Sequence, residues 1–210
     1  MARWSRLETT LRTRHGPVLA GVDEVGRGPL AGPVVACAVV MPAGVRAIAG
    51  VADSKQLDAA TRVALAARIR ATAVSIGVGA ASVREVDRVN ILQATVRAMQ
   101  RALAHCERQL GCAPDHVLVD GNPLRWLGVE HTAVVRGDAS CYSIACASII
   151  AKVLRDGLMH RLATRYDGYA WERNVGYGTL AHRDAIRTRG LTPHHRRSFC
   201  LSAQTTLELT

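Results

Sequence analysis

The sequence predicts an α/β fold in which helices cover both faces of a sheet. Two stretches near the N-terminus, 17–24 and 32–41, are apolar at almost every position, which is typical of strands buried on both sides. Residues 88–110 instead repeat apolar side chains in alternating steps of four and three, as in a helix that packs one face on a core. Apolar residues make up 49% of the 210-residue chain, which is enough to build such a core.

The same two patterns and the turn residues between them predict the other elements. A glycine-rich, irregular stretch follows the last of them. The expected helices cover about 2–14, 58–70 and 140–165, the further strands cover about 74–79, 116–120 and 132–135, and the irregular stretch is 171–179.

Charge and composition favour a nucleic-acid partner and indicate no membrane. Lys and Arg number 27 against 17 Asp and Glu, a net charge of +10, and compact basic proteins attract polyanions. No apolar run approaches the roughly 20 residues that span a bilayer, and the N-terminal stretch lacks the apolar core of a secretory signal. The six cysteines form no C-x-x-C pair. We therefore expect reduced structural thiols, a cytoplasmic location and a monomer.

Acidic residues stand where predicted strands end. Asp23 and Glu24 close the first apolar run, Asp120 closes a later strand, and Asp138 comes just after the last strand. Because sites in α/β sheets form at strand ends, we expect these carboxylates to converge. They would repel one another unless divalent cations neutralised them, and oxygen ligands suit Mg²⁺ or Mn²⁺. Two such ions about 3.5–4 Å apart promote phosphodiester hydrolysis, so the pattern indicates a metal-dependent nuclease.

Simpler interpretations of the acids stay open on local pattern alone. Asp23 and Glu24 can be solvated acids of a surface turn. Neighbours on a strand point to opposite faces, so these two share a site only if the strand ends or bulges between them. Asp138 can be a helix N-cap. The glycine turn at 26–32 loosely resembles a dinucleotide fingerprint, but its spacing and the position of the acids disfavour that reading.

A basic, histidine-bearing run near the C-terminus is expected to face nucleic-acid phosphates. The spacing of its histidines, with no cysteine in register, makes a poor zinc site. We expect the duplex backbone to pass along its arginines. The run consists of His182, Arg183, Arg187, Arg189, His194, His195, Arg196 and Arg197.

Five motifs occur in a fixed order between about residues 17 and 200. They are GVDEVGRGPLAGPV at 21–34, DSK at 53–55, DGN at 120–122, GDASCYSIACASIIAKVLRD at 137–156 and NVGYGTLAH at 174–182. In these motifs the chain resembles type 2 ribonucleases H, the family called ribonuclease HII. The resemblance implies a ribonuclease H-like fold, a five-stranded mixed sheet flanked by helices, with a helical C-terminal extension.

The resemblance also implies an activity and a division of the chain. Such enzymes cleave the RNA strand of RNA–DNA hybrids and cut 5′ to single ribonucleotides embedded in duplex DNA. They leave 3′-hydroxyl and 5′-phosphate ends and use Mn²⁺ or Mg²⁺. The implied parts are an N-terminal extension over 1–16, a catalytic domain over 17–168 and a helical substrate-binding extension over 169–210.

The motifs carry roles over to nine residues of this sequence. By position alone, Lys55 can be an ordinary exposed lysine near a helix start. Tyr177 can be a half-buried residue that only packs against its neighbours. The resemblance implies metal-binding and catalytic acids Asp23, Glu24, Asp120 and Asp138, a loop Gly26, Arg27 and Gly28 that reads the ribose 2′-hydroxyl, a phosphate contact Lys55, and an aromatic Tyr177 on the sugar at the junction with DNA.

Two other classes of protein share part of this pattern. A resolvase or integrase-type strand-transfer enzyme would have the same acids but would need no 2′-hydroxyl, so a ribose-free duplex distinguishes it. A basic nucleic-acid-binding module without activity would show no metal-dependent turnover.

Overall fold

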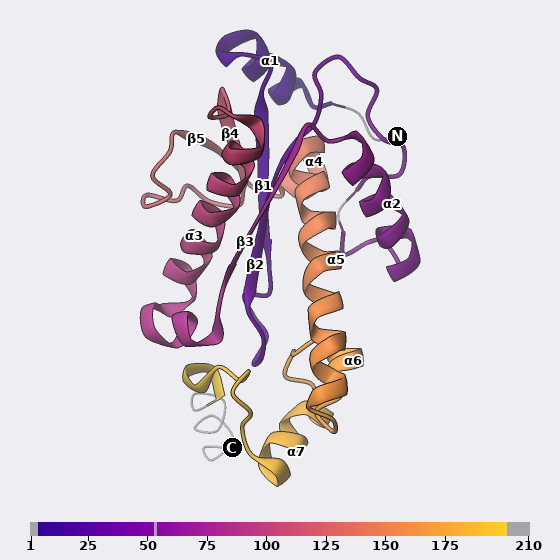
Figure 1. Ribbon diagram of the computed structural model, residues 1–210, viewed down its shortest axis with the longest axis vertical. Helices are drawn as coiled ribbons and strands as arrows, with labels where there is room; N and C mark the ends of the chain where they lie inside the picture. Colours follow the sequence, from indigo (N-terminus) through magenta and orange to yellow (C-terminus); the bar gives the residue numbers. More distant parts are fainter. Residues whose placement is uncertain (1–3, 53, 201–210) are drawn as a thin grey trace.

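A five-stranded mixed sheet forms the centre of the computed structural model (Figure 1). The strand order is β3-β2-β1-β4-β5, with β2 antiparallel to β1 and β3, and β4 parallel to β1 and β5. The predicted α/β class and five-stranded mixed sheet are confirmed. The strands are β1 (Leu19–Val25), β2 (Val34–Val40), β3 (Ser75–Ala81), β4 (His116–Asp120) and β5 (His131–Val134).

The structure describes residues 4–52 and 54–200. Asp53 of the DSK motif, the start of the helix predicted over 2–14, and the last ten residues of the predicted extension lie outside the described residues.

Helices cover both faces of the sheet, with α3 on one face and α5 and α2 on the other (Figure 1). Within the described ranges, every helix is too short or too polar to cross a bilayer. The helices are α1 (Arg6–His15), α2 (Ala59–Thr72), α3 (Val83–Leu110), α4 (Gly137–Ser140), α5 (Tyr142–Arg165), α6 (Trp171–Asn174) and α7 (Leu180–Arg189).

The helix predicted over 88–110 is longer than expected and is interrupted. At Asn90 the backbone leaves the helical region, with φ of 70°. The Asn90 side chain then accepts a hydrogen bond from the amide of Gln93 at 3.1 Å, which starts the helix again as an N-cap does. Leu92, predicted on the apolar stripe, is exposed because it lies in the first turn after this break.

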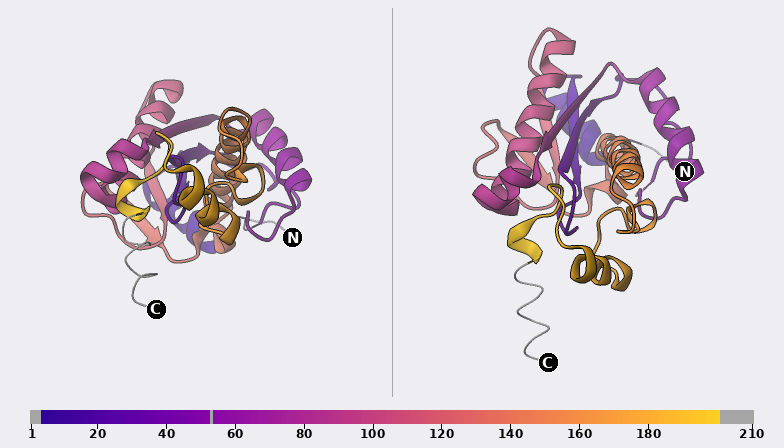
Figure 2. Two further views of the ribbon diagram at one scale, coloured as in Figure 1. Left: turned by 90° about the horizontal axis from the view of Figure 1, so that it is seen from below. Right: turned by 60° about the horizontal axis from the view of Figure 1, so that its bottom comes forward.

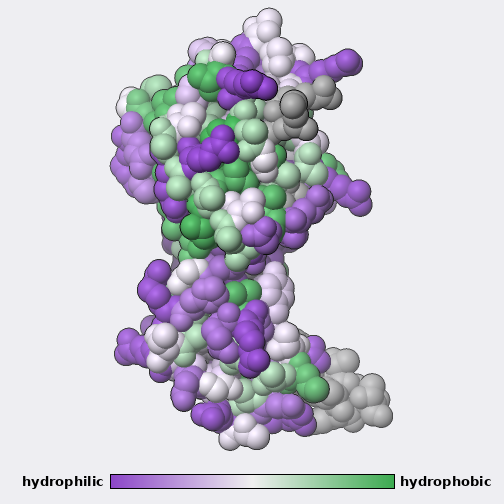
Figure 3. All heavy atoms as spheres, turned by 90° about the vertical axis from the view of Figure 1, so that its right-hand side faces the viewer, coloured by the Kyte–Doolittle hydropathy of each residue, from purple (hydrophilic) through white to green (hydrophobic). Residues whose placement is uncertain are grey.

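The C-terminal segment, residues 169–200, packs on the far end of α5 and lies beyond the end of the sheet (Figure 2). Met159 of α5 and Trp171 of α6 are fully buried in the cluster that joins them, together with Ala31 from the turn after β1. In the space-filling view, the molecule narrows between the sheet layers and this segment, and hydrophilic residues gather there (Figure 3). The fold therefore places a concave polar surface next to the end of β1.

The cysteines are free thiols, and all except Cys112 are buried. Burial raises the pKa of the Cys37 and Cys146 thiols above the usual range. These side chains therefore serve as small apolar groups of the core.

A buried carboxylate attaches α1 to α5. Glu8 is fully buried and accepts hydrogen bonds from the amides of Tyr142 at 3.1 Å and Ser143 at 2.8 Å. The Ser143 hydroxyl donates to it at 2.7 Å, and the Ser5 amide donates from the other side at 2.8 Å. The first amides of a helix have no acceptor within the helix, and its N-terminus favours negative charge. Glu8 therefore caps α5 from another part of the chain.

Replacing Glu8 by Ala is expected to destabilise the protein strongly. The amides of Tyr142 and Ser143 would lose their acceptor, and an unsatisfied buried amide costs about 1–3 kcal/mol. A loss of about 3 kcal/mol corresponds to a melting temperature about 6–12 °C lower in a chain of this size. Glu172→Ala is the control, because that exposed side chain contacts only Arg173 in the described structure. Equal melting temperatures for the two variants would contradict the capping role.

Candidate active site

Asp23 and Asp120 lie level with one another at the ends of neighbouring parallel strands. The register of β1 and β4 pairs Val22 with Val119, and these acids are the next residues on each strand. Burial raises the pKa of Asp23 well above its ordinary value, and the charges of Glu24 and Asp120 raise it further. The fold therefore brings the predicted acids of two strands within electrostatic reach of each other.

Glu24 joins this group from the opposite face of the sheet. Ala20 and Val22 pack toward α3 and Leu19 packs toward α5, so alternation places Asp23 on the α5 face and Glu24 on the α3 face. The pairing of β1 with β2 continues to Val25, so the strand neither ends nor bulges between Asp23 and Glu24. From the sequence, such an end or bulge is the expected condition for the two acids to share a site. Because β4 ends at Asp120, that side of β1 has no partner beyond this level.

The carboxyl group of Glu24 is also mostly buried. Burial raises its pKa, the guanidinium of Arg27 at 3.2 Å opposes that rise, and the charge of Asp120 adds to it. The charge of Asp120 therefore raises the pKa of both Asp23 and Glu24, although the side chains of these two residues lie on opposite faces of the sheet.

Asp138 lies on α4, which begins beside Asp120. The amides of Gly137 and Asp138 donate to Oδ1 of Asp120 at 2.6 and 3.4 Å. The residues that cap α4 and α5 are others, so the N-cap interpretation of Asp138 is wrong. Its Oδ2 faces Nζ of Lys55 at 3.7 Å, which places this lysine beside the acids while its side chain stays largely exposed.

The donor set at this end of the sheet suits a hard divalent cation. Within 4–52 and 54–200, no three Asp, Glu, His or Cys side chains are gathered closely enough to hold a metal ion as they stand. Instead, Arg27 and Lys55 balance the charge of two of the acids. Burial and the charges of neighbouring carboxylates raise the pKa of Asp23 and Glu24, which favours a bound cation, and oxygen donors fit Mg²⁺ or Mn²⁺. The residues present therefore fit the predicted ion.

A buried arginine holds the turn after β1, residues 26–33. Arg196 is fully buried and donates to the carbonyl oxygens of Gly26 at 2.5 Å, Arg27 at 2.8 Å and Gly32 at 3.0 Å. Burial lowers its pKa to about 10. The expectation that Arg196 contacts nucleic-acid phosphates is therefore wrong, because its donors are already used inside the protein.

Arg155 on α5 supports the same turn from the other side. It is also fully buried and donates to the carbonyls of Ala31, Pro33 and Val175 at 2.9–3.0 Å. Gly26 has φ of 91°, and a Cβ atom there would collide with the Arg155 side chain. Only glycine fits this position.

The Arg196 contacts fix the direction of two peptide groups. In a trans peptide the N–H points away from the preceding carbonyl. Because the carbonyls of Gly26 and Arg27 point toward Arg196, the N–H groups of Arg27 and Gly28 point away from it. Within the described part of the chain, these two amides have no protein acceptor. The turn therefore presents two adjacent donors beside the acids.

Tyr177 lies next to this turn. A Cβ atom on Gly28 would be 3.7 Å from its ring, and 45% of the residue's surface is exposed. Its amide donates to the carbonyl of Asn174 at 2.8 Å, and its own carbonyl accepts from Nδ1 of His182 at 2.8 Å. The backbone is therefore fixed while the ring stays accessible.

The histidines of the predicted basic run include two that lie inside the C-terminal segment. Since Nδ1 of His182 donates to Tyr177, its Nε2 is an acceptor. It accepts from Nε1 of Trp171 and from Nε2 of His195, both at 3.0 Å. Burial lowers the pKa of both histidines, that of His195 to about 4, so both are neutral at pH 7. The expectation that they face phosphates is wrong, because they order the backbone that carries Tyr177.

The structure adds polar residues that the sequence analysis did not assign. Ser148 of α5 hydrogen-bonds to Asp23, which opposes the rise in its pKa, and its hydroxyl lies 2.9 Å from that of Ser54. Both serines lie inside motifs of the sequence, Ser54 in DSK at 53–55 and Ser148 in the motif at 137–156, but the sequence analysis gave neither of them a role. Arg155 did have a distinguishing pattern, because it stands four residues after Ala151 and four before Met159 on the buried face of α5. A charged residue at a core position requires internal partners.

Comparisons with solved structures define the fold. Ribonuclease H2 from Pyrococcus horikoshii OT3 superposes with a TM-score of 0.73 at 23% identity, covering 91% of this chain and 99% of that one. Bst-RNase HIII in complex with Mn²⁺ gives a TM-score of 0.70 at 22% identity, covering 94% and 73%. The fold is that of the ribonucleases H.

Sequence comparisons then show the family. A profile described as Ribonuclease HII matches residues 20–202. Ribonuclease HII of Thermosynechococcus vestitus is 57% identical over 186 residues, 88% of this chain and 84% of the relative. That of Granulibacter bethesdensis is 54% identical over 198 residues, 92% and 89% of the two chains. The chain belongs to the ribonuclease HII family, which cleaves the RNA of RNA–DNA hybrids, and the predicted family is confirmed.

Proposed function

We propose that the protein cuts RNA–DNA hybrids and single ribonucleotides embedded in duplex DNA on the 5′ side of the ribonucleotide. The products are 3′-hydroxyl and 5′-phosphate ends, and two divalent ions take part. The observation that carries the proposal is the position of the turn 26–28, whose two outward amides lie directly after the acids of β1.

The acids Asp23, Glu24, Asp120 and Asp138 are the residues that would hold the ions, Mn²⁺ or Mg²⁺. When bound, such ions activate water and neutralise the charge on the leaving oxygen. The protein's own part is to bring these carboxylates to one end of the sheet and to bury Asp23 and Asp138, so that cations are favoured there over protons. Lys55, exposed beside Asp138, is placed to contact a phosphate that enters the site.

The turn supplies recognition of ribose. The amides of Arg27 and Gly28 can donate to the 2′-hydroxyl, the group that distinguishes RNA from DNA at a given position. Gly28 has no side chain to keep the sugar away from the backbone. The accessible ring of Tyr177 beside Gly28 packs on the sugar of the next nucleotide, where a deoxyribose without a 2′-oxygen lies flat.

The C-terminal segment supplies the substrate-binding extension of a catalytic domain that spans 17–168. Three arginines on α7, Arg183, Arg187 and Arg189, are exposed and can neutralise phosphates of the duplex. A monomeric state, a cytoplasmic location and the division of the chain at residues 16 and 168 stay predictions.

A duplex with one ribonucleotide in one strand tests the proposed function directly. In Mn²⁺ or Mg²⁺ we expect a single cut 5′ to the ribonucleotide and no cut in the matched all-DNA duplex. Asp120→Asn should lower kcat/KM by more than about 100-fold, since residues that only support a metal ligand cost 10–100-fold. Asp167→Asn, which removes the same charge at an exposed site, is the control.

Each departure from this result has a distinct meaning. Cutting of the all-DNA duplex at the same position would indicate a strand-transfer type of enzyme. Binding without metal-dependent turnover would indicate a binding module. Near wild-type cleavage by Asp120→Asn would remove the acids from the mechanism.

Tyr177→Ala should lose far more activity on a single embedded ribonucleotide than Tyr177→Phe, because the ring provides the sugar contact and the phenol only a further hydrogen bond. Loss of a stacking contact to a nucleotide costs about 1–3 kcal/mol, roughly 5–150-fold. On a long RNA–DNA hybrid, which has no junction to read, the Ala variant should lose less. Equal losses on both substrates with a lowered melting temperature would make Tyr177 a structural residue.

A further inference from the structure

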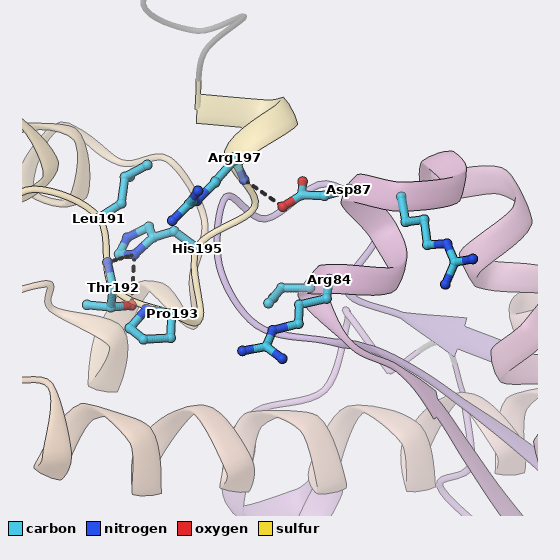
Figure 4. Close-up of a pocket in the computed structure, with 9 residues that line it drawn as sticks. Arg84, Asp87, Leu191, Thr192, Pro193, His195 and Arg197 are labelled. Carbon is cyan, nitrogen blue, oxygen red and sulfur yellow. Dashed lines mark hydrogen bonds between the residues drawn. The ribbon is translucent and has the colours of Figure 1, made fainter.

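A groove of about 620 Å³ lies between the start of α3 and the C-terminal segment (Figure 4). We call it the α3 groove. Arg84 and Arg197 lie on its opposite sides, and Leu191 and Pro193 line the C-terminal side (Figure 4). Val83 and Arg88 complete the α3 side. Its volume lies within the range of ligand sites, about 300–1,000 Å³.

Asp87 fixes the two walls of the groove to each other. Its carboxylate accepts from the amides of Arg197 and Ser198, both at 3.0 Å, and from the Ser198 hydroxyl at 2.6 Å. These bonds satisfy the one acid that lines the groove. The groove is therefore held in place by hydrogen bonds between its two walls, and the Asp87 carboxylate takes part in those bonds.

Apart from Asp87, the charged side chains that line the groove are arginines. Arg84, Arg88 and Arg197 are all exposed. Arg84 is the second residue of α3, where the helix dipole disfavours a positive charge, so the helix itself gains no stability from it. The apolar side chains of Leu191 and Pro193 lie on the same side of the groove as Arg197 (Figure 4). Guanidinium groups beside apolar side chains match the phosphates and sugars of a nucleic-acid backbone.

The groove is continuous with the proposed recognition turn. Arg197, on its rim, directly follows Arg196, whose side chain holds the carbonyls of Gly26 and Arg27. His195, which also lines the groove, forms a backbone bridge with Ala31 of the same turn. The backbone of residues 195–197 therefore joins the groove to the turn, so a duplex that binds the turn and extends past it can reach the groove.

We propose that the α3 groove binds the phosphodiester backbone of the substrate duplex away from the scissile bond, through Arg84, Arg88 and Arg197. This inference rests on the proposed function for the identity of the duplex. It assigns α3 a role in binding that its core-packing pattern does not show. An acidic peptide is the other chemistry that three arginines fit, but the continuity with the turn favours the duplex.

The test compares two double variants that lose the same charge. Arg84→Ala with Arg88→Ala empties one wall of the groove. Arg70→Ala with Arg108→Ala, the matched control, removes exposed arginines from the last turns of α2 and α3. Dissociation constants are measured in EDTA at several salt concentrations, for a 30-base-pair duplex with one central ribonucleotide, so that cleavage plays no part. Melting temperatures of both variants verify folding.

Each phosphate contact contributes about 0.9 to the slope of log K against log salt. The groove variant should therefore lower the slope by about 1.8, and the control should leave it unchanged. Shortening the duplex on one side of the ribonucleotide should abolish the difference between wild type and groove variant. The position of the cut in Mn²⁺ should be the same for all three proteins.

Equal slopes for the two double variants would overturn the proposal, whether or not the enzyme cuts at ribonucleotides. Equal slopes together with binding of a poly-glutamate peptide that only the groove variant loses would assign the groove to acidic protein partners. Conversely, a lowered slope in a protein that does not cut at ribonucleotides would retain the groove and reject the proposed function.

Discussion

The guanidinium of Arg196, buried with no ion pair to a carboxylate within residues 4–52 and 54–200, makes the contacts on which the arrangement of the site depends. An isolated buried charge is costly, and here the carbonyl oxygens of Gly26, Arg27 and Gly32 compensate it. Those bonds attach the C-terminal segment to the turn after β1 and direct two amides outward. Arg155 of α5 likewise donates to carbonyl oxygens of this turn, those of Pro33 and Ala31. The recognition turn is therefore held by side chains that never reach the substrate.

The acids, in contrast to the turn, are arranged at a cost to the stability of the protein. Asp23 is buried and lies near the charges of Glu24 and Asp120, so the protein alone gains nothing from keeping all three ionised. Such an arrangement is expected where function outweighs stability, because like charges at close range destabilise the fold until a cation neutralises them. Turn and acids meet at the end of β1, which is the arrangement that the proposed selection of the sugar and hydrolysis of its phosphate require.

Much of this could be predicted from the sequence, because strands that end in acids and helical apolar spacing are local patterns. The sheet, the long helices and the neighbourhood of Asp23 and Asp120 followed from them. The roles of Arg196, His182 and His195 could not be predicted. A run rich in arginine and histidine looks the same whether it faces phosphates or fills the inside of a small segment, and only the packing of Trp171 and the turn decides which. It could likewise not be predicted that both Asp23 and Glu24 lie near Asp120, because this depends on where the neighbouring strand β4 ends.

One measurement tests most directly whether Arg196 sets the recognition turn. Arg196→Lys keeps the positive charge but has one nitrogen in place of the three, Nε, Nη1 and Nη2, that reach the carbonyls of Gly26, Arg27 and Gly32. If it remains folded, as judged by its melting temperature, kcat/KM on a duplex with one ribonucleotide should fall about 100-fold, the effect of misplacing a site by about 1 Å. Its affinity for the all-DNA duplex should stay within about twofold, because the exposed arginines that we propose as phosphate contacts are unchanged. A folded Arg196→Lys protein that cuts at the wild-type rate would contradict the account.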